Sequence, residues 1–292
     1  MASGAAIFLN EGAGSARTND VRLTVQLARR ALDADLHVTA TRNAAELTAW
    51  LTERIAGYGT AVIAGGDGSL GVAYNVAADR PGLTLGYLPA GFGNATRHLL
   101  RLPRTPEDLV EVLVRADARP VDLVEVDGRL ALFAGAGWDA RVAGRYARAG
   151  ARRLPGWAWA VARSVPDLWR RPQVEVRADG RLAHRGPMEF MVVGTTPFYG
   201  RGLRVNPGAR PNVGTMALRV YPGPAPRLAI ETARWILNLT PHAERIDARR
   251  VEVRALDGAP IPLQRDGDLV AARVAWTFEI RPAAVRFIGR WA

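Results

Sequence analysis

The stretch AVIAGGDGSLG, residues 61–71, decides how this chain of 292 residues folds. An apolar run typical of a buried strand leads directly into the glycine-rich turn GGDGS, residues 65–69. Glycines at the end of a strand let backbone N–H groups approach phosphate oxygens with no Cβ in the way, and Asp67 leaves one carboxylate among them. The stretch therefore predicts a nucleotide-binding turn. The alternative is a tight strand-to-helix turn whose glycines only supply unusual backbone angles.

Strands and helices alternate on both sides of this turn. Apolar runs at 5–10 and 83–89 are typical of strands, whereas residues 43–57 carry apolar side chains at helical spacing. This alternation predicts a mostly parallel sheet, with ligand chemistry at the carboxyl ends of its strands. We therefore expect residues 1–119 to form an α/β nucleotide-binding domain.

From about Pro120 the pattern changes to paired apolar runs around Asp-Gly turns, as in VDLVEVDGRLALFAGAG (121–137). Residues 151–171 form the one evident helical insert. The pattern predicts a mainly antiparallel β domain over 120–292, which we expect to hold the substrate, with the final strand able to return to the first domain.

Two further glycine-rich turns follow predicted strands. PAGFGN (89–94) ends one strand, and NEGAGS (10–15) follows the first. Because the carboxyl ends of parallel strands meet at one edge of a sheet, all three turns would open on the same edge and could hold a nucleotide. Asn94 lies at a predicted helix start, where its side chain could cap the helix or reach a phosphate or ribose.

The composition excludes several chemistries. The 39 Lys+Arg residues are all arginine, so a GxxxxGK[ST] phosphate loop, a protein-kinase strand lysine and a Schiff-base lysine are ruled out. With no cysteine there is no disulfide and no thiolate. The net charge of +11 favours an anionic partner, although scattered arginines also fit a generally basic surface. No nucleic-acid recognition motif occurs, and we expect no nucleic-acid partner.

Several motifs together resemble a known family. In chain order they are Asn10 with its glycine loop, Thr39, GGDGS, PAGFGN, GAGWDA (135–140), GTTPFYGRGLRVNPGA (194–209) and QRDGD (264–268). Their order and spacing resemble the diacylglycerol kinase catalytic-domain family, which includes bacterial lipid kinases and sphingosine and ceramide kinases and is remotely related to NAD kinase. The resemblance covers nearly the whole chain. It implies an α/β domain followed by a β-sandwich domain, with the active site in the cleft.

The resemblance also implies an activity: transfer of the γ-phosphate of ATP, with Mg²⁺, to a lipid hydroxyl, most simply that of diacylglycerol, in phospholipid biosynthesis. The nucleotide would be held by Asn10, Thr39, Gly65, Gly66, Asp67, Gly68, Ser69, Gly91, Phe92 and Asn94. Asp67 would also lie near the metal and the γ-phosphate. The family's DGE motif aligns with Asp266-Gly267-Asp268, so Asp268 is the candidate base, with Asp266 beside it. From the residues alone, Asp-Gly is a hairpin turn.

The chain departs from the family pattern at three places. Phe92 stands where the family has a threonine, and Ala95 where it has an aspartate; Phe92 could stack on an adenine or simply pack. The acidic segment that holds a structural Mg²⁺ in some bacterial members reads NVGTMA (212–217), so we predict that this metal site is absent. Asp268 is shorter than the family's glutamate. Two alternatives therefore stay open: a catalytically weak nucleotide- or lipid-binding member, and a kinase of soluble substrates related to NAD kinase.

The helical insert is the candidate for membrane contact. Its apolar face carries Trp157, Val161, Val165, Leu168 and Trp169, and it is flanked by Arg152, Arg153, Arg170 and Arg171. Tryptophan favours the membrane interface and arginine meets anionic head groups. The alternative is a helix packed across the β domain with its tryptophans buried. No signal peptide or spanning segment is visible, so we expect a cytoplasmic enzyme that binds anionic membranes peripherally, with a homodimer left open.

Overall fold

The computed structural model describes residues 4–149, 153–169, 171–223 and 225–291. It divides into two compact units. Unit 1 contains the chain up to Val121, residues 200–202, and the chain from Ala283 onward. Unit 2 contains Asp122–Tyr199 and Leu203–Pro282. Arg152 and Arg170, which we expected to flank the membrane-binding helix, lie outside the described residues.

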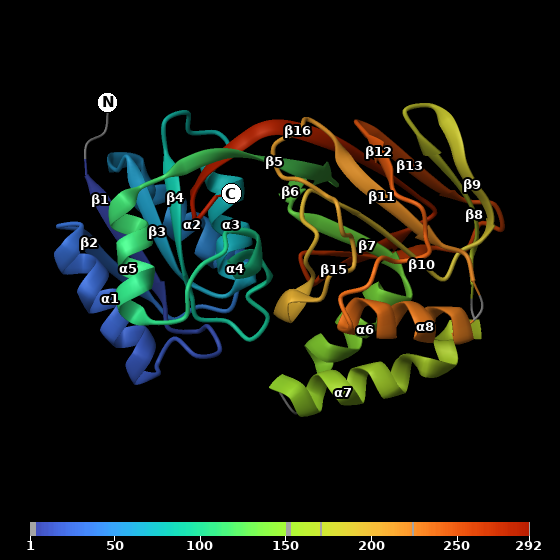
Figure 1. Cartoon of the computed structure of the whole chain (residues 1–292), viewed down its shortest axis with the longest axis horizontal. Coiled ribbons are helices and arrows are strands. Elements are labelled where there is room, and N and C mark those ends of the chain that lie inside the picture. Colours follow the sequence, from blue (N-terminus) through green and yellow to red (C-terminus); the bar gives the residue numbers. More distant parts are fainter. Residues whose placement is uncertain (1–3, 150–152, 170, 224, 292) are drawn as a thin grey trace. The chain divides into compact units, whose positions relative to one another are not determined.

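Unit 1 is an α/β layer structure with a parallel sheet, as predicted (Figure 1). Its strands are β1 (Ala5–Asn10), β2 (Asp35–Thr39), β3 (Thr60–Gly65) and β4 (Thr84–Pro89), in the order β2-β1-β3-β4. The last residues of β16 (Ala275–Ile288) add a parallel strand beside β4 through Arg286 and Phe287. The apolar runs of β1, β3 and β4 are buried, because helices cover both faces of a parallel sheet, whereas β2 at the edge of the sheet is partly exposed.

The helices of unit 1 follow the strands in alternation. They are α1 (Asn19–Ala31), α2 (Ala44–Arg54) with the short 3-10 helix η1 (Ile55–Gly57), α3 (Asp67–Ala77), α4 (Ala95–Leu99) and α5 (Pro106–Arg115). α1 packs beside α5, and α2 packs beside α3. Right-handed crossovers in a sheet of this order place α1 on one face and α2 and α3 on the other. The strand ends that carry the three glycine-rich turns all lie at the carboxyl edge.

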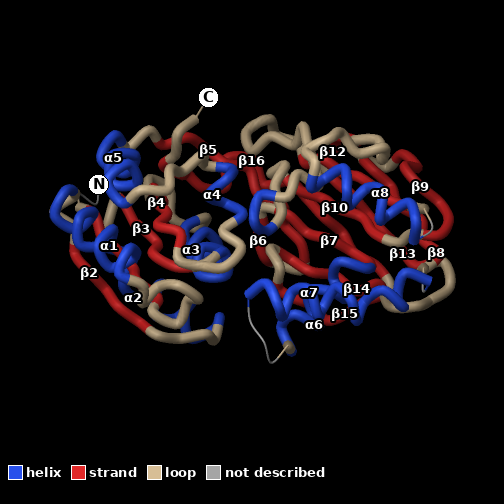
Figure 2. The backbone as a smooth tube through the Cα atoms, turned by 60° about the horizontal axis from the view of Figure 1, so that its bottom comes forward, coloured by secondary structure: helices blue, strands red, loops and turns tan. Residues whose placement is uncertain are grey.

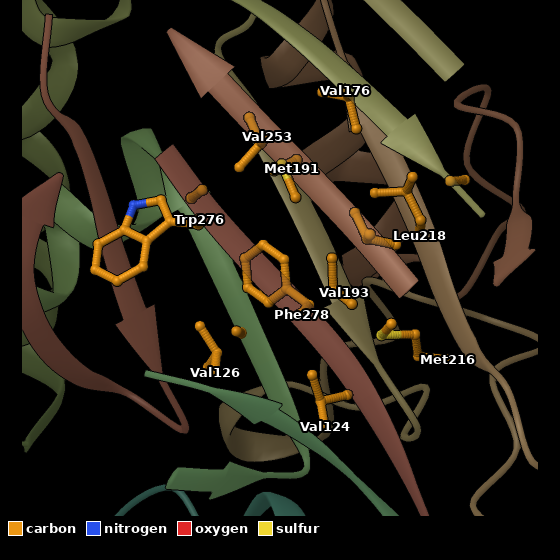
Figure 3. Packing of buried hydrophobic residues seen from close by; sticks show 14 of the residues in the cluster. Val124, Val126, Val176, Met191, Val193, Met216, Leu218, Val253, Trp276 and Phe278 are labelled. Atoms are coloured by element: carbon orange, nitrogen blue, oxygen red, sulfur yellow. The ribbon is translucent and has the colours of Figure 1, made fainter. Parts of the chain in front are cut away.

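Unit 2 is an antiparallel β-sandwich, which confirms the expected class of the second domain. One sheet has six strands in the order β12-β11-β10-β7-β14-β15: β7 (Phe133–Gly137), β10 (Phe190–Gly194), β11 (Met216–Tyr221), β12 (Ile246–Ala248), β14 (Ile261–Arg265) and β15 (Asp268–Arg273). The facing layer contains β5 (Ala118–Val126), β6 (Arg129–Ala131), β8 (Gln173–Ala178), β9 (Arg181–Pro187), β13 (Arg250–Ala255) and the first part of β16. Side chains such as Met191, Leu218, Val253 and Phe278 fill the space between the sheets (Figure 3).

Helices cover the outer face of the six-stranded sheet (Figure 2). They are α6 (Trp138–Arg148), α7 (Arg153–Ser164) with the 3-10 helix η2 (Val165–Trp169), and α8 (Ala225–Ile236). They meet the sheet through a second buried cluster around Phe190, Tyr221 and Trp235. The expectation of one helical insert was incomplete, because α6 and α8 also pack on the sheet, through Trp138 of α6 and through Leu228 and Trp235 of α8. Within the described ranges, no helix is long and apolar enough to cross a membrane.

Candidate active site

Asp67 joins two glycine-rich turns of unit 1, GGDGS after β3 and PAGFGN after β4. It begins α3 where β3 ends, and its Oδ2 accepts the backbone N–H of Ala95 at 3.1 Å. Its Oδ1 accepts the backbone N–H and the hydroxyl of Thr96, each at 3.4 Å. Burial raises the pKa of the Asp67 carboxyl, while the hydrogen bonds from Ala95 and Thr96 oppose that rise. The carboxylate therefore caps α4 from a neighbouring loop.

The backbones of these two turns lie directly against each other. A Cβ added to Gly91 would lie 2.6 Å from the Cα of Gly66, so glycine is required there. The Ala90 N–H donates to the Gly65 carbonyl at 2.7 Å. β3 and β4 pair in parallel as far as Gly65 opposite Pro89, so both turns leave the sheet at the same edge.

Asn94 closes the second turn and does not cap α4. Its backbone is left-handed, with φ +47°, and it makes no side-chain cap hydrogen bond. Its Oδ1 accepts the Gly91 N–H at 2.9 Å and the Tyr87 hydroxyl at 3.0 Å, and its Nδ2 donates to the Gly91 carbonyl at 2.8 Å. The capping role expected of Asn94 belongs to Asp67, because the Asn94 amide is used inside its own loop.

The third loop, which follows β1, is bonded to the other two. The buried Asn10 donates from Nδ2 to the Ser69 hydroxyl at 3.0 Å and accepts the Gly12 N–H at 2.9 Å. The Ser15 N–H donates to the Ala90 carbonyl at 2.8 Å. Asn10 and Ser69 therefore hold the loops together as well as lying at the edge where the sequence places the nucleotide.

Arg42 adds a positive charge to this edge. Thr39 ends β2, and its carbonyl accepts the Glu11 N–H at 2.7 Å. Three residues later, the exposed Arg42 donates from Nε to the Gly12 carbonyl at 3.3 Å. The lack of lysine implies that arginines offset phosphate charge, but the sequence did not indicate which one. The only feature of the sequence that could have singled out Arg42 was its position just after the second strand.

Gly68 and Phe92 complete the edge. No heavy atom lies within 4 Å of a Cβ added to Gly68, so the first turn of α3 is open at this position. The first N–H groups of a helix have no partner within the helix, and they attract anions. Phe92, half-buried in the second turn, has no hydroxyl to offer a phosphate. All ten residues assigned to the nucleotide thus lie at the ends of strands β1 to β4 of unit 1.

The DGD motif forms a hairpin tip in unit 2. Asp266 and Gly267 have φ +48° and +95°, as the two central residues of a type I′ turn between β14 and β15 require. The Asp266 carboxylate accepts the N–H groups of Leu132 and Phe133, each at 3.1 Å from Oδ1. Asp266 therefore anchors the tip to the start of β7. Asp268 begins β15 and is exposed.

The surroundings of Asp268 favour proton acceptance. Although the residue as a whole is exposed, protein atoms around its carboxyl desolvate it and raise the pKa of Asp268, and Arg265 and Arg129 counteract the rise. Arg265 is itself held by a bond from Nη1 to the Val126 carbonyl at 2.9 Å. A carboxylate of raised pKa is a stronger base than a free aspartate.

Family models match both units of the chain. Residues 4–126 match the diacylglycerol kinase catalytic domain, and residues 133–289 match the YegS C-terminal NAD kinase beta sandwich-like domain. The chain belongs to the diacylglycerol kinase catalytic-domain family. Like other members of this family, it is a kinase, of the YegS and diacylglycerol kinase type.

Individual relatives agree with this membership. The chain is 28% identical over 283 residues to a Pseudomonas aeruginosa protein named "Probable lipid kinase YegS-like", covering 93% of this chain and 90% of that protein. Its fold is similar to a diacylglycerol kinase from Bacillus anthracis, with a TM-score of 0.76 at 17% identity over 99% and 97% of the two chains. It is also similar to an NAD kinase from Archaeoglobus fulgidus in complex with ATP, with a TM-score of 0.56 at 16% identity over 98% and 93%.

A partly buried acid in this kinase, Asp139, lies next to the DGD hairpin. Asp139 Oδ2 accepts from Gln264 Nε2 at 3.0 Å, and Gln264 Oε1 accepts the Gly267 N–H at 2.7 Å. Burial raises the pKa of Asp139 to about 7. Its Oδ1 is buried without a hydrogen-bond partner in the part of the chain that the structure describes. A Cβ at Gly135 would lie 1.8 Å from Oδ2, so the GAGWDA motif needs that glycine to admit the carboxylate. The motif could be recognised in the sequence, but no role for Asp139 followed from it.

The donor groups fit a magnesium ion bound together with nucleotide. Mg²⁺ is usually held by one or two carboxylates plus substrate phosphates and water. The Asp67 carboxylate can supply one such ligand group, and it accepts hydrogen bonds from Ala95 on Oδ2, from Thr96 on Oδ1 and from the backbone N–H of Asn94. Across the described ranges, no group of three or more His, Cys, Asp or Glu side chains could hold a metal ion on its own. The segment 212–217, which lacks the family's acidic residues, is held by a different contact: the Gly214 N–H donates to Asp122 Oδ2 at 2.7 Å.

Proposed function

We propose that this kinase transfers the γ-phosphate of ATP to a lipid hydroxyl, most simply that of diacylglycerol. The observation that supports this most is the bonding of three glycine-rich loops into one strand-end edge, with Asp67 between two of them. Family membership gives the reaction class, and this edge offers the N–H groups, the carboxylate and the arginine that a triphosphate needs.

In this proposal unit 1 holds the donor. The open first turn of α3 at Gly68 supplies N–H groups and the positive end of the helix dipole to the phosphates. Arg42 offsets part of their negative charge. Asp67 would hold Mg²⁺, and the ion would supply positive charge to the phosphates. Asn10, Ser69 and Asn94 keep the loops in place through the bonds described above.

Asp268 acts as the base in the same proposal. The lipid hydroxyl oxygen forms a bond to the γ-phosphorus, the bond from that phosphorus to the bridging oxygen breaks, and ADP leaves with the electron pair. The hydroxyl proton passes to the Asp268 carboxylate. Asp266 is a positioning residue, because its carboxylate is bonded to the backbone of Leu132 and Phe133.

One observation favours a second candidate, a member that binds nucleotide and lipid but transfers phosphate slowly. Phe92 replaces a hydroxyl in the second turn, and Asp268 replaces a longer acid. Both changes leave the loops at the strand ends bonded together. Slow transfer with normal ATP binding would be the signature of this candidate.

We also propose that α7 and η2 bind an anionic membrane surface. α7 turns its small residues Gly156, Ala160 and Ser164 inward, and it packs on α6. Its large side chains face solvent: Trp157 and Trp159 are 40% and 45% exposed, and Trp169 of η2 is 70% exposed. A helix that buries small residues and exposes tryptophans suits an interface partner. Leu168 differs from the expectation, because it packs against the buried cluster around Phe190.

The outer side of α8 extends this apolar surface. Ile230, Ile236 and Leu237 are each more than half exposed, and Leu239 follows them in the next turn. η2 and α8 both pack on the cluster around Phe190, so they cover the same face of the six-stranded sheet. The sequence offered only α7 and η2 as a membrane contact.

A transfer assay tests the proposed reaction. The full chain is incubated with γ-labelled ATP, Mg²⁺ and, separately, diacylglycerol, a sphingoid base, a glycerophospholipid and NAD. Label on a lipid hydroxyl supports the proposal, and label on NAD alone contradicts it. Bound ATP without transfer to any acceptor supports the second candidate.

A further inference from the structure

A cavity of about 270 Å³ lies in unit 2 at one end of the six-stranded sheet. Its wall is formed by the end of β11 with Tyr221, by the first half of α8 with Leu228, and by the residues around His242. A single buried water needs only ~10–15 Å³, and sites for drug-sized ligands start near ~300 Å³. The cavity therefore has room for a small organic molecule. None of the residues assigned above to nucleotide, metal or proton transfer lines it.

Glu189 lines this cavity as an unpaired acid. Glu189 is only 3% exposed. Neither its Oε1 nor its Oε2 has a hydrogen-bond partner among the residues that the structure describes. Its backbone is fixed, since its N–H donates to the Tyr221 carbonyl at 3.1 Å and its carbonyl accepts the Trp138 N–H at 2.8 Å. A buried carboxylate without a partner is costly unless it is protonated or neutralised by a cation. Burial raises the pKa of Glu189 to about 7, against the pull of Arg171.

The other acid deep in the wall already has its partner. Glu231 accepts the His242 N–H at 3.1 Å from Oε1, and its Oε1 lies 2.8 Å from His242 Nδ1. Glu231 is 6% exposed and thus as deeply placed as Glu189. Glu189 is therefore the acid in the wall that still needs a counter-charge. Arg227 and Arg171 are exposed, so water screens their charges.

The wall favours an organic cation over a metal ion. Metal ions of the hard class need several oxygen ligands, and in the described chain no group of three or more His, Cys, Asp or Glu side chains is placed to bind one. Two free oxygens on one carboxylate instead match the N–H donors of an ammonium group. Beside the charged side chains of the wall, which include Arg227, the residues Val220, Pro222 and Ala243 add an apolar part that suits a short carbon chain.

We propose that this cavity binds a small primary ammonium group, with Glu189 as its counter-ion. The ammonium could belong to a free amine or to the head group of an aminophospholipid, because both present the same N–H donors to the carboxylate. The inference does not depend on phosphoryl transfer, since it concerns a separate set of residues.

Calorimetric titration of the full chain with ethanolammonium at pH 7.5 tests the proposal. We expect saturable binding by the wild type, at least tenfold weaker binding by Glu189→Gln, and a change of less than twofold for Glu244→Gln, an exposed acid on the same wall. Tetramethylammonium, which has no N–H donor, should bind at least tenfold more weakly to the wild type. No binding at millimolar ethanolammonium, or equal binding of the two cations, overturns the proposal even if Glu189→Gln does not fold.

A second arm distinguishes the two sources of the ammonium. Dihexanoyl phosphatidylethanolamine, used below its micelle concentration, is compared with free ethanolammonium and with dihexanoyl phosphatidylcholine. Tighter binding of the phosphatidylethanolamine than of the free amine assigns the cavity to a lipid head group, and the reverse order assigns it to a free amine. Equal binding of the two phospholipids contradicts the role of the N–H donors.

Discussion

Asp67 Oδ2 accepts the backbone N–H of Ala95 at 3.1 Å, so one carboxylate fixes the relative positions of two glycine-rich turns. Asp67→Ala should leave N–H groups of α4 without their acceptor and should lower the free energy of unfolding by about 1–2 kcal/mol, as for a lost helix cap. Asp67→Asn keeps one acceptor oxygen but turns an NH2 donor toward the other N–H group, so it should recover only part of this loss. Urea unfolding of the three proteins measures this.

The same pair of variants separates structure from ligand binding. Both should bind Mg-ATP at least tenfold more weakly, because neither offers a carboxylate to the metal. Wild-type ATP affinity in Asp67→Asn would show that the carboxylate serves the loops alone. Titration calorimetry with ATP in the presence and absence of Mg²⁺ measures the difference.

Arg42 should contribute charge to the nucleotide site. Arg42→Gln is expected to weaken ATP binding about tenfold, or about 1.4 kcal/mol, without changing thermal stability. Arg22→Gln, an exposed arginine on α1, is the matched control and should change little. The loss should shrink at high salt because salt screens exposed charges. Equal losses from both variants would show only a general effect of net charge.

Asp139 should make stability depend on pH. Because burial raises its pKa to about 7 in the folded chain, the folded state holds a proton that the unfolded state has released between about pH 4 and 7. The contribution of Asp139 to the free energy of unfolding is therefore fully present below about pH 4. It falls as the pH rises from about 4 and is lost above about 7. Asp139→Asn has no carboxyl to ionise. Its free energy of unfolding relative to the wild type should therefore rise over this window, by up to about 4 kcal/mol.

Urea unfolding at pH 5 and pH 8 checks this sign. Asp79→Asn, at an exposed aspartate in unit 1, is the control and should show the same difference from wild type at both values. A relative stability of Asp139→Asn that falls between pH 5 and pH 8 would contradict the buried, proton-holding carboxyl.

The exposed tryptophans should mediate membrane binding. Trp157→Ser combined with Trp169→Ser is expected to reduce flotation with anionic liposomes severalfold while thermal unfolding stays unchanged, since both side chains face solvent. Trp276→Ser is not a suitable control, because Trp276 is buried and donates to the Ile261 carbonyl at 2.9 Å. Leu182→Ser, at an exposed apolar side chain on β9, is the comparison. Undiminished flotation of the double variant would assign binding to another surface.

Much of the fold could be predicted because it rests on local patterns. Apolar strands alternating with helices gave the parallel sheet of unit 1, and Asp-Gly turns between apolar runs gave the antiparallel sheets of unit 2. Parallel strands also bring their carboxyl ends to one edge, so the meeting of the three glycine loops followed from the strand order. The Asp266-Gly267 turn followed from the preference of type I′ hairpins.

The contacts that could not be predicted join residues far apart in the sequence. Asp67 reaches Ala95 across 28 residues, and Gln264 reaches Asp139 across 125. No periodicity encodes such pairs. The sequence left open whether Asn94 caps α4 or reaches the nucleotide, because it did not reveal the left-handed backbone that directs the Asn94 amide into its own loop.

The most direct test of the central claim is transfer of labelled phosphate from ATP to diacylglycerol in mixed micelles by the wild type and by Asp268→Asn. We expect label on the lipid hydroxyl with the wild type. Asp268→Asn should bind ATP within twofold of the wild type but lose at least a hundredfold in transfer rate, because the proton acceptor is removed and the nucleotide loops are untouched. Unlabelled lipid with the wild type, or an unchanged rate in Asp268→Asn, would contradict the account.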